Sequence, residues 1–227
     1  KIFINPVTKK DLDIVDFALE KDIDIFCVSF VENSDNILKV KKYAKKKGKN
    51  VFIIAKIERD EAIKNFDELL KVADGIMIAR GDLGIQIPIE NIPTIQKSLI
   101  RKANIAGIPV ITATQMLKSM TDSNRPTRAE VTDIANAIID GTDAIMLSEE
   151  TAVGKYPVET IEMMSKIAQS TEKRRNGAGL PSTLKEYLKK TVKFTELSIA
   201  DVISLNAIEA AKILNTKYIL STTSTGS

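Results

Sequence analysis

Short apolar runs alternate along the chain with longer stretches in which apolar residues recur every three or four positions. The short runs are rich in β-branched residues and contain few polar ones, which is typical of parallel strands buried on both faces. The longer stretches have the spacing of one helix face. The apolar runs predict strands at Ile23–Phe30, Val51–Ile57, Gly75–Ala79, Pro109–Thr114 and Asp143–Ser148.

Residues that start or stop helices bound the periodic stretches. Thr127 and Glu130 have the spacing of a capping box, and Gly141 follows the last apolar position of the same stretch. After Tyr156-Pro157, a long helix is expected to run to about Arg175. The other periodic stretches predict helices at Thr8–Glu20, Ser34–Lys47, Arg59–Val72, Ile92–Ala106 and Thr127–Asp140.

The alternation of strands and helices predicts successive β/α units, and therefore an α/β fold with a parallel sheet. We interpret the units as the last five of a (β/α)8 TIM barrel, in which working side chains gather at the carboxyl ends of the strands. Because five strands do not close such a barrel, we expect three further strands upstream of Lys1. An open sheet with exposed edges is the alternative.

A glycine-rich stretch after the long helix suggests a domain boundary. We therefore divide the chain into a partial barrel at residues 1–175, a linker at 176–182 and the truncated start of a C-terminal α/β domain at 183–227. That last part is predicted to contain a helix at Leu197–Leu214 and a strand at Lys217–Thr222.

The composition excludes several kinds of chemistry. The 227 residues include no histidine, which excludes Ser-His-Asp catalysis, Cys-His catalysis and His-rich zinc sites. The single cysteine, Cys27, lies in an apolar run, so we expect it to be packed in a strand rather than to act as a nucleophile. A lone cysteine suits a reducing compartment. The net charge of +3 is spread along the chain and no apolar run is long enough to span a membrane, so we expect a cytoplasmic protein without nucleic-acid or membrane partners.

Polar side chains stand at the carboxyl ends of the predicted strands. Lys56 and Glu58 are two positions apart at one strand end, so they point to the same side. Asp82 follows the next strand in a glycine-rich turn. Two carboxylates beside a lysine at one edge of a sheet suit a divalent cation and an anionic substrate. The remaining strand ends carry Ser29, Thr112, Thr114, Ser148 and Glu150.

Five long, collinear motifs resemble the pyruvate kinase family. The resemblance covers essentially the whole chain and corresponds to the C-terminal half of the family's barrel and the start of its C-terminal domain. Its length and order argue against a chance similarity. The motifs are FIIAKIERDEAI, MIARGDLGIQIP, PVITATQMLKSM, NRPTRAEVTDIANAIIDGTDAIMLS and EETAVGKYPVET.

The resemblance implies Mg²⁺-dependent phosphoryl transfer from phosphoenolpyruvate to ADP, giving pyruvate and ATP in glycolysis. Glu58 and Asp82 match the ligands of the catalytic Mg²⁺ or Mn²⁺. Lys56 matches the lysine that neutralises charge on the phosphoryl group and the enolate oxygen. Gly81 and Asp82 match the turn that holds the substrate carboxylate. Thr114 matches a threonine that contacts this carboxylate and helps to organise enolate protonation.

Other implications of the resemblance concern residues around the site and beyond the chain. Ser148 and Glu150 match the polar network behind the substrate. The K⁺ ligands, a phosphate-binding arginine and the lid over ADP belong to parts of the family's barrel that this chain lacks, so we expect the isolated chain to be inactive. The loop Asn124–Arg128 lies near a subunit contact in the family, which implies a homo-oligomer, a tetramer by resemblance. The closing Thr222–Ser227 resembles an effector phosphate loop, but lacks basic neighbours.

The chain departs from the family pattern at two rim positions. Glu32 stands where the family usually has arginine, and Glu149 replaces a small residue. Two other functions stay open at this point. One is a Mg²⁺-dependent lyase or aldolase barrel acting on pyruvate enolate, and the other is a non-catalytic scaffold fragment.

Overall fold

The computed structural model describes residues 6–177, 199–216 and 218–221. The chain divides into two compact units, Lys1–Ala178 and Gly179–Ser227. The first unit is a parallel sheet with helices between its strands, which confirms the predicted α/β class and the partial barrel. Within the described residues, no helix is long and apolar enough to cross a membrane.

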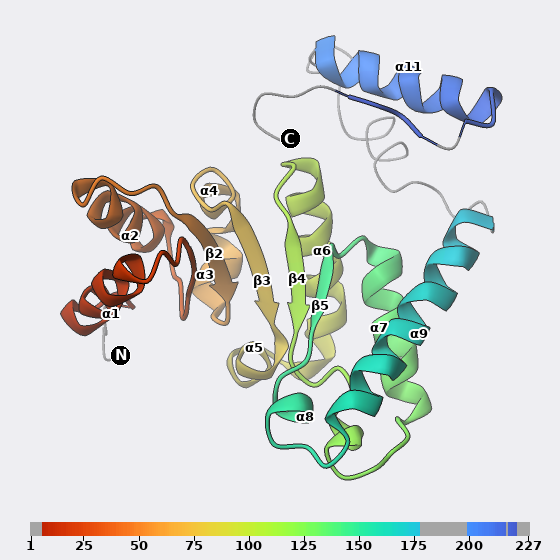
Figure 1. The fold of residues 1–227 in the computed structure, drawn as a ribbon, viewed down its shortest axis with the longest axis horizontal. Helices are drawn as coiled ribbons and strands as arrows, with labels where there is room; N and C mark the ends of the chain where they lie inside the picture. The colour runs from red at the N-terminus through yellow and green to blue at the C-terminus, as the bar shows by residue number, and fades with distance from the viewer. Residues whose placement is uncertain (1–5, 178–198, 217, 222–227) are drawn as a thin grey trace. The chain divides into compact units, whose positions relative to one another are not determined.

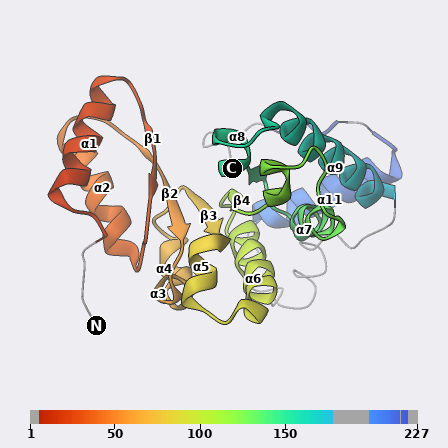
Figure 2. The same cartoon turned by 90° about the horizontal axis from the view of Figure 1, so that it is seen from below.

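The strands form one five-stranded sheet in chain order, and every neighbouring pair is parallel. Figure 2, which looks along the strands, shows the sheet as an arc with α3, α4 and α6 on its outer side, and Figure 1 shows α5 beyond the carboxyl end of β3. The strands lie inside the predicted apolar runs, and the third has the predicted bounds. They are β1 (Ile25–Val28), β2 (Phe52–Ile57), β3 (Gly75–Ala79), β4 (Val110–Ala113) and β5 (Ala144–Met146).

Most helices follow the predicted pattern, with two differences. The predicted helix Arg59–Val72 is two short helices that meet at Asn65, whose side chain donates a hydrogen bond to the carbonyl oxygen of Glu32 at 2.8 Å. Short helices also form directly after β3 and β5, where no periodicity predicted them. The helices are α1 (Lys9–Glu20), α2 (Ser34–Lys46), α3 (Asp60–Lys64), α4 (Phe66–Leu69), α5 (Arg80–Gln86), α6 (Ile92–Ile105), α7 (Arg128–Asp140), α8 (Glu149–Ala152) and α9 (Pro157–Gly177), with 3₁₀ helices η1 (Ile89–Asn91) and η2 (Lys118–Thr121).

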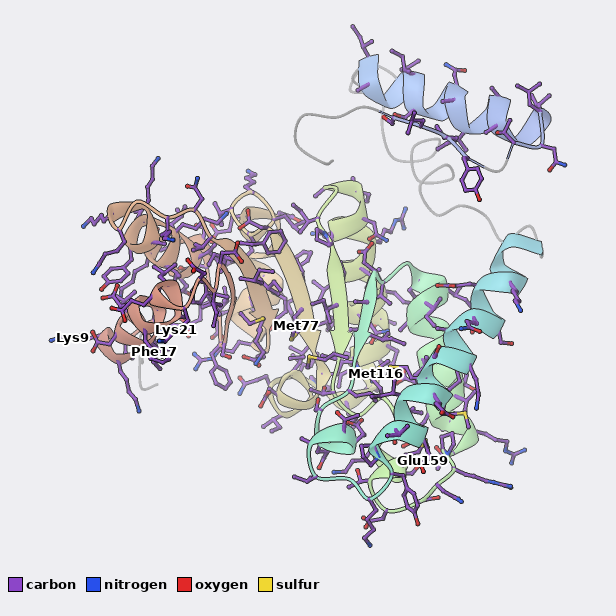
Figure 3. The ribbon with its side chains drawn as sticks, viewed as in Figure 1. Lys9, Phe17, Lys21, Met77, Met116 and Glu159 are labelled. Carbon is purple, nitrogen blue, oxygen red and sulfur yellow. The ribbon has the colours of Figure 1, made fainter. Side chains whose placement is uncertain are left out.

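The two faces of the sheet are buried by different partners. Alternate residues of the strands face the helices on the outer side, where they join the largest apolar cluster, including Ile53, Ile76 and Val110. The residues between them face the inside of the arc and form a smaller layer of Ile54, Met77 and Ala113. Figure 3 labels Met77 within the sheet. Burial on both faces accounts for the nearly continuous apolar runs in the sequence.

Two aspartates hold the amino ends of the strands in register. The N–H of Asp74 donates to the carbonyl oxygen of Ile53 at 2.9 Å, and its carboxylate accepts from the N–H of the same residue at 2.8 Å. Asp143 repeats both bonds with Val110, at 2.9 and 2.8 Å. Each aspartate therefore brackets one residue of the preceding strand in the sheet.

Cys27 is exposed, so the prediction that it is packed within the sheet was wrong. It lies on β1, which has only one neighbouring strand among the described residues, and it faces the inside of the arc together with the exposed Ile25. An apolar run predicts a strand, but does not indicate whether a further strand covers it. Desolvation of the sulfur raises the pKa of the Cys27 thiol, which disfavours the nucleophilic thiolate.

The second unit contains α11 (Ile199–Ile213), close to the predicted helix at Leu197–Leu214. Residues 218–221 are not a strand, contrary to the prediction for Lys217–Thr222. A strand needs a hydrogen-bonded neighbour, and the described part of this unit contains no second strand. Residues 178–182 of the predicted linker and residues 222–227 of the closing loop lie outside the described residues.

Candidate active site at the carboxyl ends of the strands

Lys56 and Glu58 form an ion pair at the carboxyl end of β2. The Lys56 Nζ lies 2.7 Å from Glu58 Oε1, and it also donates to the hydroxyl of Ser29 at 3.1 Å. The Glu58 side chain is 1% exposed, and its second oxygen, Oε2, accepts the backbone N–H of Phe30 at 2.6 Å. Both oxygens of this buried carboxylate therefore have a donor, which offsets the cost of removing the charge from water. The alternation in the sequence predicted that both side chains point to the same side of the strand.

Gly81 and Thr114 are joined by a hydrogen bond between two neighbouring strand ends. The N–H of Gly81, in the first turn of α5, donates to Thr114 Oγ1 at 2.8 Å. The Thr114 hydroxyl in turn donates to the carbonyl oxygen of Ala113 at 2.6 Å. Thr114 has φ +72°, a left-handed conformation that is unfavourable for a β-branched residue.

Arg80 holds the turn that contains Thr114. Its side chain is 9% exposed, and Nη2 donates to the carbonyl oxygens of Thr114 at 2.8 Å and of Gln115 at 3.5 Å. Nη2 also lies 2.8 Å from the sulfur of Met116, which is labelled in Figure 3. The other nitrogen, Nη1, pairs with Asp133 of α7 at 2.6 Å. The buried arginine thus connects the strained turn after β4 to a helix of the outer layer.

Ser148 and Glu150 connect two rim loops. Glu150 is fully buried, and its carboxylate accepts from the N–H of Ser148 at 2.8 Å and from the N–H of Leu117 at 3.2 Å. The latter bond crosses from the loop after β5 to the loop after β4. The Ser148 hydroxyl oxygen is buried and has no hydrogen-bond partner among the described residues. These contacts suit residues that shape the site from behind.

Asp82 lies in the first turn of α5 and is partly buried. Within the part of the chain that the structure describes, its carboxylate has no hydrogen-bond or ion-pair partner, and no group of three or more His, Cys, Asp or Glu side chains could hold a metal ion. Mg²⁺ commonly uses one or two carboxylates and fills its other positions with water and substrate oxygens. Glu58, Asp82 and an anionic substrate are a suitable donor set for this ion.

The predicted site residues therefore meet as three separate contacts: Lys56 with Glu58, Gly81 with Thr114, and Ser148 with Glu150. In the described residues, no hydrogen bond or ion pair joins one of these contacts to another. Thr112, expected at the rim, is instead fully buried on the outer face and lies 3.0 Å from the Thr142 hydroxyl. Its position in β4 explains this, because it alternates with the inward-facing Ala113.

Sequence reasoning missed the residues that hold these contacts in place, chiefly Phe30, Arg59 and Arg80. The available signal was position, since Arg59 and Arg80 each stand beside a predicted site residue in the sequence. A residue next to a predicted site residue at a strand end can therefore hold the site in place without taking part in the chemistry.

Comparison with known proteins identifies the family. Residues 1–161 match the family model for the pyruvate kinase barrel domain. The chain belongs to the pyruvate kinase family. Pyruvate kinases from Thermococcus litoralis and Clostridium acetobutylicum are 53% and 46% identical to it over 98% and 97% of its length. A crystal structure of a pyruvate kinase from Cryptosporidium parvum has a TM-score of 0.85 and 40% identity, and it covers 96% of the chain.

The family match also defines how much of a relative this chain represents. It spans 46% of both curated relatives and 44% of the Cryptosporidium parvum chain. The matching region contains all the strand-end residues described above, since each lies within residues 1–161.

Proposed function

We propose that this chain carries the metal and enolpyruvate half of a pyruvate kinase active site. The reaction would be the Mg²⁺-dependent transfer of a phosphoryl group from phosphoenolpyruvate to ADP, which gives pyruvate and ATP in cytoplasmic glycolysis. The observation that carries the proposal is the ion pair of Lys56 with the buried Glu58 at the end of β2, with Asp82 directly after the neighbouring strand β3. One cation and two anions at the carboxyl ends of neighbouring strands support the binding of a phosphorylated anion together with a divalent ion.

Lys56 has the donors that phosphoryl transfer needs. An ammonium group has three N–H bonds, of which the hydrogen bond to Ser29 uses one, and its charge is paired with Glu58. A further N–H can therefore bind a substrate oxygen. As the bond between phosphorus and the enol oxygen breaks, negative charge grows on that oxygen, and a fixed ammonium group stabilises it without reorganising.

Glu58 and Asp82 would hold the Mg²⁺ or Mn²⁺. When bound, the ion supplies a Lewis acid that polarises the substrate oxygens. Glu58 Oε2 accepts one hydrogen bond and Oε1 is paired with Lys56, and each oxygen keeps a further lone pair, so cation binding does not require either contact to break. The contact of Glu58 with the Phe30 N–H orients the carboxylate in advance.

Gly81 and Thr114 would bind the substrate carboxylate. In the present arrangement the Gly81 N–H and the Thr114 hydroxyl are engaged with each other and with Ala113. A carboxylate oxygen can replace these acceptors for both donors, because an anionic acceptor forms the stronger hydrogen bond. Thr114 would then lie beside the enolate as it takes up a proton.

The other parts of the reaction are proposed for a protein of the length of its relatives. K⁺ and ADP would depend on residues outside the present chain, and the oligomer, a tetramer by resemblance, would also involve the loop Asn124–Arg128. We therefore propose that residues 1–227 alone do not turn over. The lyase, aldolase and scaffold alternatives have no observation in their favour, since the family match points to pyruvate kinase.

A Mn²⁺ titration of the 227-residue chain tests the proposal. Free Mn²⁺ would be measured by its paramagnetic resonance signal, with and without oxalate as a mimic of pyruvate enolate. We expect saturable binding that oxalate tightens and that Asp82→Asn abolishes. Asp67→Asn is the matched control, because Asp67 is an exposed acid of α4 that pairs only with Lys102 among the described residues.

Equal binding by the wild type and Asp82→Asn would contradict the assignment of Asp82. A coupled assay of pyruvate formation should show no turnover above background for the 227-residue chain. Turnover comparable to that of a complete pyruvate kinase would disprove the proposed need for further residues.

A further inference from the structure

The turn after β1 contains a group of contacts that no role in phosphoryl transfer explains. We propose that Arg59 and Glu32 form a positioning pair, which holds the Phe30 N–H on Glu58 and thereby sets the orientation of this carboxylate. The inference rests on the proposed function in one respect, since it takes Glu58 as a cation ligand. It adds two residues, neither of which touches the substrate or the cation.

Phe30 is strained in the conformation that serves Glu58. Its φ is +54°, in the left-handed region that bulky residues rarely adopt. In this conformation its N–H reaches Glu58 Oε2 at 2.6 Å. Such strain persists only where neighbouring groups over-determine the backbone, and it is common at functional sites.

Arg59 supplies part of this constraint from the outside. Its guanidinium group lies over the Phe30 ring, with Cζ 5.3 Å from the ring centroid, and Nη1 forms an ion pair with Glu32 Oε1. Arg59 directly follows Glu58 in the chain. Glu58 accepts the N–H of Phe30, and the Arg59 side chain lies over the ring of the same phenylalanine. One side chain therefore contacts the ring of Phe30 and the residue two positions beyond it.

Glu32 is itself fixed by two neighbouring helices. Its N–H donates to Asn36 Oδ1 of α2 at 2.9 Å, and its carbonyl oxygen accepts from Asn65 Nδ2 at 2.8 Å. The Glu32 carboxylate also forms an ion pair with the guanidinium group of Arg59. Arg59 is therefore paired with Glu32, and Lys56 is the cation paired with Glu58.

The partial exposure of the pair distinguishes positioning from core packing. The side chains of Arg59 and Glu32 are 28% and 24% exposed, and Phe30 is 43% exposed. Exposed ion pairs contribute little to stability. Loss of this pair should therefore leave the fold intact and change the orientation of the buried Glu58.

The test is the same Mn²⁺ titration, applied to Arg59→Gln, Glu32→Gln and the double variant. Residues that orient a metal ligand typically change metal affinity about 10- to 100-fold, and the exposure of this pair favours the low end, about 10-fold, for Arg59→Gln. Arg59→Lys keeps the charge and should recover part of the loss. The double variant should bind no more weakly than Arg59→Gln, because the two residues act as one unit.

Lys118 and Glu149 provide the matched control. They also form an ion pair between loops at the carboxyl ends of neighbouring strands, but no described contact links them to Phe30 or Glu58. Lys118→Gln and Glu149→Gln should leave Mn²⁺ affinity unchanged. Thermal unfolding of every variant shows whether it is folded at the titration temperature, and Glu32→Gln, which removes only a charge, serves if Arg59→Gln is not.

The outcomes separate this inference from the proposed function. If Glu58→Gln abolishes Mn²⁺ binding while Arg59→Gln and Glu32→Gln bind as the wild type does, the positioning pair is disproved and the metal site stands. Wild-type binding that does not depend on Glu58 would overturn both. A loss in Arg59→Gln that Arg59→Lys does not recover in any part would also count against the pair.

Discussion

The turns after β1 and β4 have the same backbone strain, but the contacts that hold them lie in different parts of the protein. Each puts a non-glycine residue in the left-handed region, Phe30 at φ +54° and Thr114 at φ +72°, and each is held by an arginine. Arg59 contacts the turn after β1 from the surface, through the ring of Phe30 and the ion pair with Glu32. Arg80 contacts the turn after β4 from the interior, by donating hydrogen bonds to the carbonyl oxygens of Thr114 and Gln115.

The comparison shows that a strained turn at the carboxyl ends of the strands can be held by contacts at the surface or by contacts in the protein interior. The surface arrangement involves the two loops beside Glu58, so it can change without repacking the protein. The interior arrangement extends through Asp133 to α7, so a change there affects the outer layer as well. The two arginines should therefore differ most in their contribution to stability.

Arg80→Met gives the largest expected difference. It removes the buried donor of the Thr114 carbonyl oxygen and the partner of Asp133, which is 38% exposed and therefore partly screened by water, so the cost should be about 2 kcal/mol. Arg59→Met should cost about 1 kcal/mol or less, since its pair is partly exposed. Urea denaturation of both variants measures the difference. Equal losses would remove the distinction between an interior and a surface support.

The two turns also differ in which part of the residue makes the bond. At Thr114 the side-chain hydroxyl accepts from Gly81, whereas at Phe30 the backbone N–H donates to Glu58. Thr114→Val should therefore destabilise the fold by about 1–2 kcal/mol, because the Gly81 N–H loses its acceptor. Thr114→Ser keeps the hydroxyl and should cost less. A free energy of unfolding that is the same for both variants would argue against this hydrogen bond.

The loop after β4 has a second, pH-sensitive support at Glu130. Burial alone would raise the pKa of this carboxyl, but hydrogen bonds from Ser119 and Thr127 hold it below its ordinary value of 4.5. Because the folded-state pKa is lowered, the stabilisation is present above pH 4.5 and is lost as the pH falls through the folded-state pKa.

Glu130→Gln should accordingly cost about 1 kcal/mol at neutral pH, as expected for loss of a capping carboxylate. The difference from the wild type should shrink in acid. Free energies of unfolding measured at neutral pH and below pH 4.5 would check this, and a constant difference would contradict it.

Gln115 offers the smallest effect and the most direct measure of strain. It follows Thr114, has φ +54° and is exposed, and Arg80 contacts only its backbone. Gln115→Gly should raise stability by about 0.5 kcal/mol, because relief of left-handed strain slightly exceeds the entropy cost of glycine. Gln115→Ala keeps the strain and is the control. A Tm that falls more for glycine than for alanine would show that this turn is not strained.

Most of the fold could be predicted because parallel strands buried on both faces leave a clear apolar pattern. The run Gly75–Ala79 is an example, since its predicted and observed bounds agree. The short helix α5 could not be predicted from periodicity, because Gly81 and Gly84 interrupt its sequence. The exposure of Cys27 was also missed, since an apolar run carries no information on its neighbours.

The candidate site was predictable where chemistry and alternation coincide. Lys56 and Glu58 are two positions apart on one strand, so their position on the same side followed from the period of a strand. The supports at Phe30 and Thr114 depend on left-handed φ angles at residues that rarely adopt them. Such angles result from tertiary contacts, and local sequence has no pattern that indicates them.

The aspartates before β3 and β5 bear on how the sheet avoids mispairing. A parallel strand that shifts by two residues keeps the same side chains facing the helices, so the apolar pattern alone does not oppose the shift. Asp74 favours the observed alignment, because its carboxylate accepts the N–H of Ile53, and a shift would move the carboxylate away from that N–H. Asp143 imposes the same condition at Val110. The aspartate directly before β3 or β5 thus helps to fix the alignment of that strand with the strand that precedes it in the chain.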